Sequence, residues 1–249
     1  MLVIRNYDRT RAVTYARRWA LSRNPLYFDY TGIGGNCTNF VSQCLYAGSC
    51  TMNYTPVFGW YYLSPAERTA AWTGVTFFYN FLTKNDNVGP FGREASAEEL
   101  LPGDVIQLGR NGTGFYHTLL LVGREGEELL VAAQSDDALD RPLSTYTYDY
   151  ARFLHVEGVR LDIPDTEDCF ASLLAGLAIV PNAATLPPPP ADTEMPAPPD
   201  GEMPMPPDGG IPPSEEESPA ENAPSDENAP SAEDVPPEEE DENAPSEEG

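Results

Sequence analysis

Residues 34–45 read Gly34-Gly35-Asn36-Cys37-Thr38-Asn39-Phe40-Val41-Ser42-Gln43-Cys44-Leu45, a glycine turn that leads directly into an amphipathic helix. Apolar side chains recur every three or four residues after Cys37, so one face of this helix can pack on a core. A thiol in the first turn faces unpaired backbone N–H groups and the positive end of the helix dipole, which favour the thiolate and lower the pKa. Cys37 is therefore a candidate nucleophile; the alternative is a cysteine that only fills space in the core.

The segments before this helix are a predicted helix and a glycine turn, which would place Cys37 directly after a tight turn. Residues 8–22 have an apolar face and predict a helix that ends before Asn24-Pro25. The glycines at positions 32, 34 and 35 permit the backbone angles of a tight turn in front of Cys37. The cysteine helix itself is expected to stop at Gly48.

Composition divides the chain near residue 187. Residues 187–249 contain 18 of the 26 prolines, 20 of the 40 acidic residues and no Lys or Arg, and the pentapeptide Glu-Asn-Ala-Pro-Ser occurs there three times. Such a segment cannot bury a core, so we expect a disordered acidic tail that acts as a spacer or as a docking tail. We expect one folded domain over residues 1–165 and a short apolar helix with a connector over residues 166–186.

Charge and cysteine usage exclude several classes of function. The formal net charge is −26, with no basic patch interleaved with aromatics, which argues against a nucleic-acid partner. No apolar run is long enough to span a membrane, and no signal peptide is visible at the N-terminus. The cysteines at positions 37, 44, 50 and 169 match no zinc spacing or disulfide scaffold, so we expect mostly reduced thiols, no metal and no cofactor.

The second half of the domain has the pattern of an antiparallel sheet. Strands are predicted over residues 105–108, 116–122, 128–134 and 153–161, with the second and third forming a hairpin. A helix is predicted over residues 75–84. Helices first and antiparallel strands after them give an α+β fold, in which the cysteine helix packs on the sheet.

The chain has only two histidines that could serve Cys37 as a base, His117 and His155. His117 is the candidate, because it starts a strand after a glycine-rich loop, whereas His155 lies inside an apolar strand and is expected to be structural. If Val122 pairs with Glu128, His117 faces Ala133 and lies within one step of Gln134. Gln134 is therefore the first choice for orienting the imidazole. Asp136 and Asp137 are the alternatives, since a carboxylate stabilises an imidazolium better than an amide does.

Two further groups of residues are candidates for the site. The backbone N–H of Cys37 could bind an oxyanion, with Asn36 as a second donor or simply as a helix cap. Trp60 and Tyr61 lie in an aromatic segment, Trp60-Tyr61-Tyr62, that either belongs to the core or lines a substrate groove.

Several motifs together resemble the bacterial family known as the "putative amidase domain", which is grouped with the NlpC-type and CHAP-type cell-wall hydrolases. They are the cysteine segment 34–43, Trp60-Tyr61-Tyr62, Trp72, Gly103-Asp104-Val105-Ile106-Gln107, His117-Thr118 and Asp140-Arg141-Pro142-Leu143-Ser144. The resemblance covers residues 6–162. It implies a papain-like fold with Cys37 as nucleophile and His117 as base. Family members commonly have Asp at position 36 and a His-Thr pair near Gln134-Ser135.

The resemblance implies a cysteine amidase or peptidase that cuts amide bonds in peptidoglycan and acts as a monomer outside the cell or at the cell wall. An alternative is a catalytically impaired binding module of the same fold with an acidic interaction tail. The changed residues near position 134 favour this alternative, whereas the presence of both Cys37 and His117 opposes it.

Overall fold

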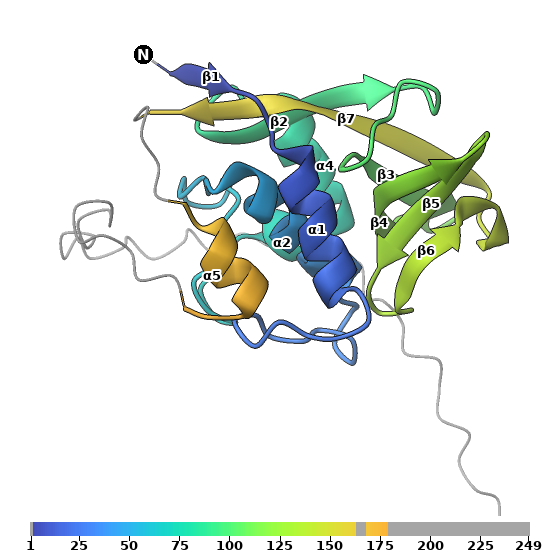
Figure 1. Cartoon of the computed structure of the whole chain (residues 1–249), viewed down its shortest axis with the longest axis horizontal. Coiled ribbons are helices and arrows are strands. Elements are labelled where there is room, and N and C mark those ends of the chain that lie inside the picture. The colour runs from blue at the N-terminus through green and yellow to red at the C-terminus, as the bar shows by residue number, and fades with distance from the viewer. Residues whose placement is uncertain (1, 163–167, 179–249) are drawn as a thin grey trace, which may run out of the picture. The chain divides into compact units, whose positions relative to one another are not determined.

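The structure is a computed structural model that describes residues 2–162 and 168–178. Its helices lie close together, beside strands β3 to β6, while β1, β2 and β7 cross above them in the view of Figure 1. The expected tail, residues 187–249, lies outside the described residues. The helices are α1 (Arg9–Trp19), α2 (Cys37–Ser49), α3 (Ala70–Thr73), α4 (Val75–Lys84) and α5 (Phe170–Ala175), with a 3-10 turn, η1 (Leu143–Thr145).

Seven strands form one sheet in which all pairs are antiparallel, as the sequence predicted for this α+β fold. Their order is β1-β7-β3-β4-β5-β6, and β2 also pairs with β7. The strands are β1 (Val3–Arg5), β2 (Gly89–Ala95), β3 (Val105–Arg110), β4 (Gly114–Glu125), β5 (Glu128–Ala133), β6 (Ala138–Pro142) and β7 (Tyr150–Leu161).

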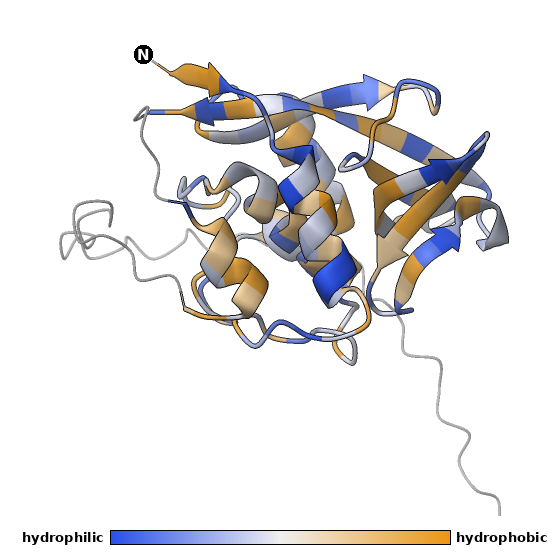
Figure 2. Cartoon of the chain, viewed as in Figure 1, coloured by the Kyte–Doolittle hydropathy of each residue, from blue (hydrophilic) through white to orange (hydrophobic). Residues whose placement is uncertain are grey.

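The central strand β4 is apolar on both faces because a separate hydrophobic cluster covers each one. Leu120 and Val122 pack in the cluster that includes the buried faces of α1 and α2. Leu119 and Leu121 point the other way, into a second cluster formed within the sheet and by η1. The hydropathy colouring shows the resulting apolar strands beside the helices (Figure 2).

The first helix forms where its apolar face predicts it. The Asp8 side chain caps α1 by accepting from the Arg11 N–H, and Ala12, Tyr15, Ala16 and Trp19 are buried. The second helix begins at Cys37 as predicted but runs one residue beyond Gly48. It ends where Cys50 takes a left-handed conformation. Gly48 has a different role, since a Cβ there would lie 2.3 Å from the Tyr7 ring.

The hairpin of β4 and β5 forms, but the expected register is wrong. Glu125 pairs with Glu128, and a bulge between Leu121 and Gly123 shifts the pairing, so that Leu120 lies opposite Ala132. The same register continued to the end of β5 sets Thr118, rather than His117, opposite Gln134.

The prediction of mostly reduced cysteines is wrong for two of the four. Cys50 and Cys169 form a disulfide across a sequence separation of 119 residues, while Cys37 and Cys44 are free and buried. The disulfide joins the end of α2 to the start of α5. The short apolar helix near residue 170 accordingly packs back on the domain, with Leu173 fully buried.

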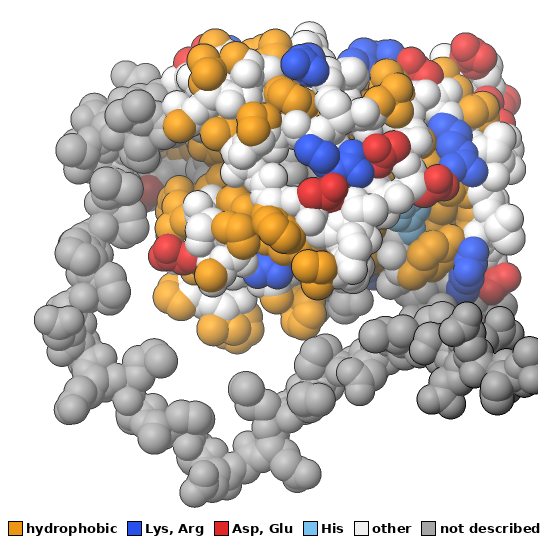
Figure 3. All heavy atoms as spheres, turned by 90° about the horizontal axis from the view of Figure 1, so that it is seen from below, with side chains coloured by type: hydrophobic (Ala, Val, Ile, Leu, Met, Phe, Trp, Pro, Cys, Tyr) orange, Lys and Arg blue, Asp and Glu red, His pale blue; other side chains and the backbone are white. Residues whose placement is uncertain are grey.

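The exposed face seen from below in Figure 3 has charged side chains of both signs close together and an area of apolar side chains. Ion pairs at the surface of the described residues include Arg17–Asp140 and Arg23–Asp137. Within residues 2–162 and 168–178, no helix is long and apolar enough to cross a membrane.

Candidate active site

Cys37 lies at the start of α2, in a corner between the glycine turn and the end of β5. Gly34 and Gly35 both have positive φ, 85° and 103°, so the turn uses conformations that favour glycine. The turn is fastened to the sheet because the Asn36 N–H donates to Ser135 Oγ. A Cβ on Gly35 would lie 3.3 Å from the same oxygen, so a larger residue would crowd this contact.

Asn36 connects the turn to the sheet through its side chain. Its Oδ1 accepts from the Tyr30 N–H (3.0 Å) and from Asn39 Nδ2 (2.8 Å), and its Nδ2 donates to Gln134 Oε1. It makes no side-chain cap bond to α2, although it occupies the cap position. Of the two roles considered for Asn36, simple capping does not match these contacts; the side chain instead fixes the position of the residue before the thiol.

The Cys37 sulfur lies against β4 at the residue that follows His117. The backbone N–H of Thr118 points to the sulfur, and the Thr38 and Thr118 hydroxyls are 2.9 Å apart. Burial raises the pKa of the Cys37 thiol above its ordinary value, and the N–H groups of Thr118, Thr38 and Cys37 lower it by less. The expected lowering of the Cys37 pKa is therefore wrong in sign, because the side chain is only 7% exposed.

His117 is nearly as buried as Cys37, with 8% of its surface exposed. Burial lowers the pKa of the imidazole to about 4; the charge of Asp136 raises the pKa and that of Arg141 lowers it, both by less. The ring lies between aromatic neighbours, with centroids 6.1 Å from Tyr116 and 5.9 Å from Tyr146. Thiol and imidazole are thus both uncharged at neutral pH.

Gln134 meets the glycine turn at this corner through Asn36, whereas the His117 ring packs against Tyr116 and Tyr146, so the predicted residues do not form a hydrogen-bonded triad. Within residues 2–162 and 168–178, no hydrogen bond joins the His117 ring to Cys37 or to Gln134. Gln134 uses its amide elsewhere: Nε2 donates to the Trp19 and Ser22 carbonyls (2.8 and 2.7 Å), and Oε1 accepts from Asn36. Gln134 therefore holds the end of α1 and the glycine turn to the sheet.

The alternatives to Gln134 lie further out. Asp136 pairs with Arg141 (2.7 Å), and Asp137 pairs with Arg23 (2.8 Å). Of the two aspartates, Asp136 raises the pKa of His117 through its charge. Arg141 in turn lies over the Tyr146 ring, 3.9 Å from its centroid.

The aromatic candidates have different environments. Trp60 is completely buried, its Nε1 donates to Ser42 Oγ, and its ring packs on Trp72, so it belongs to the core. Tyr61 is partly buried and lies 5.4 Å from the ring of Tyr54. Of the two, only Tyr61 has surface that a substrate could contact.

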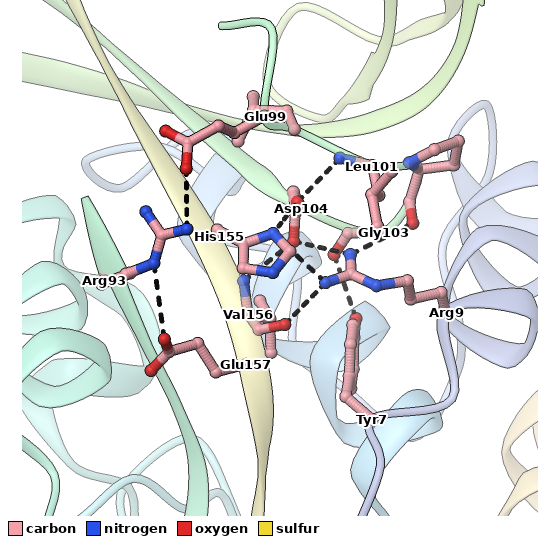
Figure 4. A network of polar contacts seen from close by, with 12 residues as sticks. Tyr7, Arg9, Arg93, Glu99, Leu101, Gly103, Asp104, His155, Val156 and Glu157 are labelled. Carbon is pink, nitrogen blue, oxygen red and sulfur yellow. Dashed lines mark hydrogen bonds and ion pairs between the residues drawn. The ribbon is translucent and has the colours of Figure 1, made fainter. Parts of the chain in front are cut away.

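His155 takes part in a separate network that joins α1 to the sheet (Figure 4). The fully buried Asp104 carboxylate contacts His155 Nδ1 (2.8 Å), pairs with Arg9 (2.6 Å), and accepts from the backbone N–H groups of Leu101 and Val156 (both 2.8 Å). Arg9 also donates to the Val156 carbonyl. These contacts fit a structural role for His155.

Sequence reasoning did not assign roles to Thr118, Ser135 and Tyr146, which contact the candidate residues. Ser135 has a positive φ of 86°, rare for a residue with a side chain, and this conformation turns the chain beside Asn36. A polar residue inside an otherwise apolar expected strand was the signal for Thr118, and a polar residue directly after an expected strand was the signal for Ser135. Nothing in the local pattern pointed to Tyr146. Among the described residues, no group of three or more His, Cys, Asp or Glu side chains could hold a metal ion.

Comparison with known proteins agrees with the motifs around this site. The family model described as "Putative amidase domain" matches residues 6–156. "Uncharacterized protein YhbB" of Bacillus subtilis (strain 168) is 38% identical over 136 residues, which cover 53% of this chain and 42% of that protein. The chain thus spans less than half the length of that relative. No solved structure matches the chain. The family match includes Cys37, His117 and Gln134 and most of the described domain, and the chain therefore belongs to the "Putative amidase domain" family.

Proposed function

We propose that this chain is a cysteine-dependent amide hydrolase, an amidase or peptidase with a papain-like arrangement. The observation that carries the proposal is the Thr118 N–H at the Cys37 sulfur, because it sets the thiol against the strand that carries His117. Membership of an amidase-domain family supports amide bonds as the substrate. The proposed roles are nucleophile for Cys37 and general base for His117, with Gln134 and Asn36 supporting the turn.

In the proposed reaction His117 takes the proton of the Cys37 thiol as the sulfur attacks the amide carbon. The imidazolium returns this proton to the leaving nitrogen, the C–N bond breaks, and an acyl-thioester remains on Cys37. Water, deprotonated by the same imidazole, then attacks the thioester carbon, the C–S bond breaks and the acid leaves, and the imidazolium returns the proton to the Cys37 sulfur. The Cys37 backbone N–H at the helix start is the proposed donor to the oxyanion. Hydrogen bonds between such groups often tighten only when substrate binds.

Peptidoglycan is the proposed substrate class, either its stem peptides or the amide bond that joins them to the sugar. This follows from the resemblance to NlpC-type and CHAP-type cell-wall hydrolases. The Cys50–Cys169 disulfide supports a location outside the reducing cytosol, since such bonds persist in oxidising compartments.

A second candidate is a binding module that retains the fold without turnover. The supporting observation is that the Gln134 amide forms its hydrogen bonds with Asn36 and two backbone carbonyls. The His117 ring is therefore left without the orienting contact that was expected from Gln134. Such a module would bind peptidoglycan and release no product.

The two candidates are separated by incubating the full chain with purified peptidoglycan fragments and following new amino groups, product masses and alkylation of Cys37 by a peptide chloromethyl ketone from pH 5 to 9. We expect hydrolysis, and alkylation of Cys37 faster than that of a small thiol at pH 7. Cys37→Ala and His117→Ala should each abolish hydrolysis. Retained binding with no product in the unmodified chain would establish the binding module, and neither binding nor fast alkylation would refute both candidates.

A further inference from the structure

The Tyr146 hydroxyl is buried and makes no hydrogen bond of ordinary geometry among the described residues, although the Arg141 guanidinium lies close enough to interact with it. Buried polar groups in native proteins nearly always find a partner, so an orphan hydroxyl needs an explanation. Tyr146 follows η1, and its ring centroid lies 5.9 Å from that of His117. The orphan hydroxyl therefore belongs to the ring that packs on the proposed base.

The phenol is held in place by its surroundings. Arg141 lies over the Tyr146 ring and is itself fixed by hydrogen bonds to Asp136, to Thr145 Oγ1 (2.9 Å) and to the Thr145 carbonyl (3.3 Å). Burial raises the pKa of the Tyr146 hydroxyl, more than Arg141 lowers it, so the phenol stays protonated at neutral pH. A neutral, fixed phenol can accept a hydrogen bond without taking the proton.

Among the described residues, the neighbouring imidazole of His117 makes no hydrogen bond either. The residue expected to orient it, Gln134, bonds to Asn36, Trp19 and Ser22 instead. An unpaired phenol oxygen and an unpaired imidazole thus lie in adjacent rings, both shielded from water. Shielding makes a hydrogen bond between them more valuable than it would be in solvent.

We propose that Tyr146 is the positioning residue for His117, and that its phenol oxygen accepts a hydrogen bond from the imidazolium formed during the reaction. The inference rests on the proposed function. When His117 takes the Cys37 proton, the S–H bond breaks and an N–H bond forms on one ring nitrogen. The N–H on the other nitrogen then donates to Tyr146, which keeps its own proton. Tyr146 would supply the orienting contact that Gln134 does not make.

The test is Tyr146→Phe, which removes the hydroxyl and keeps the ring against His117 and Arg141. We expect amide hydrolysis to slow about tenfold, the effect of losing roughly one hydrogen bond. The acidic limb of the pH–rate profile, which is set by protonation of His117, should move to lower pH, because the imidazolium loses an acceptor and gives up its proton more easily. The matched control is Tyr148→Phe, since Tyr148 is a partly buried tyrosine of the same segment outside the site. Its rate should stay within about twofold of that of the unmodified chain.

A second measurement does not depend on turnover. In the Cys37→Ala background, NMR titration of the His117 ring should give a lower pKa with Phe at position 146 than with Tyr. Unchanged rates and an unchanged His117 pKa would overturn the role of Tyr146 while hydrolysis by the unmodified chain left the proposed function standing. A slower rate with no change in pH profile or pKa would also overturn it, since that is the result of a merely structural role. Failure of the unmodified chain to hydrolyse or bind any fragment would refute both proposals.

Discussion

At the scale of single residues, His117 is a buried base that the fold keeps uncharged. Burial lowers the pKa of this imidazole to about 4, against about 6.5 in an unfolded chain. Between these values the unfolded chain binds more protons than the folded one. The contribution of His117 to stability is therefore complete above about pH 6.5 and declines as the pH falls toward 4.

This linkage gives a measurable pH dependence. Between pH 7 and pH 4, His117 should reduce the free energy of unfolding by about 3 kcal/mol, the equivalent of its shift in pKa. Urea unfolding of the unmodified chain and of His117→Gln at both pH values isolates this residue, because the other titrating groups are shared. Equal pH dependence in the two chains would show that folding does not lower the pKa of the His117 imidazole.

The sequence alone could propose Cys37 and His117 as candidates but could not give their electrostatics. The position of a cysteine at a helix start suggests the nucleophile, and the presence of only two histidines in the sequence leaves two candidates for the base. The sign of the Cys37 pKa shift depends on how completely β4 and the glycine turn cover the sulfur, and the covering residues are distant in sequence. Tyr146 was missed for the same reason, since only the folded sheet brings η1 beside β4.

At the scale of elements, Gln134 joins three segments at the end of β5. Its side chain bonds to the carbonyls of Trp19 and Ser22 at the end of α1 and to Asn36 before α2. Gln134→Ala should lower the free energy of unfolding by about 2–4 kcal/mol, because it removes three buried hydrogen bonds and leaves their partners unpaired. It should also slow turnover, since Asn36 precedes the nucleophile.

Asp136→Ala is the matched control for Gln134→Ala, two positions along the chain. Asp136 is exposed and forms a surface ion pair with Arg141, so its loss should change stability by less than about 1 kcal/mol. Turnover should fall less than with Gln134→Ala. Urea titrations and initial rates measure both effects, and the reverse order of rates would transfer the supporting role to the aspartate.

The main elements could be predicted from periodicity, whereas their pairing could not. The expected helices at residues 8–22, 37–48 and 75–84 correspond to α1, α2 and α4, and the expected strands to β3, β4, β5 and β7. The register was wrong because β4 continues to Glu125, which pairs with Glu128, so the turn is shorter than expected. The bulge between Leu121 and Gly123 then shifts the pairing by one residue. Strand β2 was not predicted because its two glycines and its proline are residues that sequence patterns assign to turns rather than to strands. Gly92 is required there, since a Cβ would lie 2.3 Å from the His155 carbonyl.

At the scale of the folded domain, the helix that carries Cys37 is fastened at both ends. Its start is tied to the sheet through the Asn36 contacts with Gln134 and Ser135. Its end is tied to the N-terminal segment, where the Asp8 N–H donates to the Gly48 carbonyl, and to α5 by the disulfide. A thiol held this way keeps its position relative to the sheet that carries His117, which the proposed reaction requires.

The disulfide should contribute much of the stability of the domain. Closing a loop of more than 100 residues in the unfolded chain gives a stabilisation of about 4–5 kcal/mol in the chain-entropy view. Reduction with dithiothreitol should lower the midpoint of urea unfolding accordingly, and Cys169→Ser should do the same without reductant. Dithiothreitol should have no further effect on Cys169→Ser, which is its internal control. Thiol titration of the unfolded oxidised chain should find two thiols, Cys37 and Cys44, and four after reduction. Four thiols before reduction would mean that the bond does not form, and the end of α2 would then be held by packing alone.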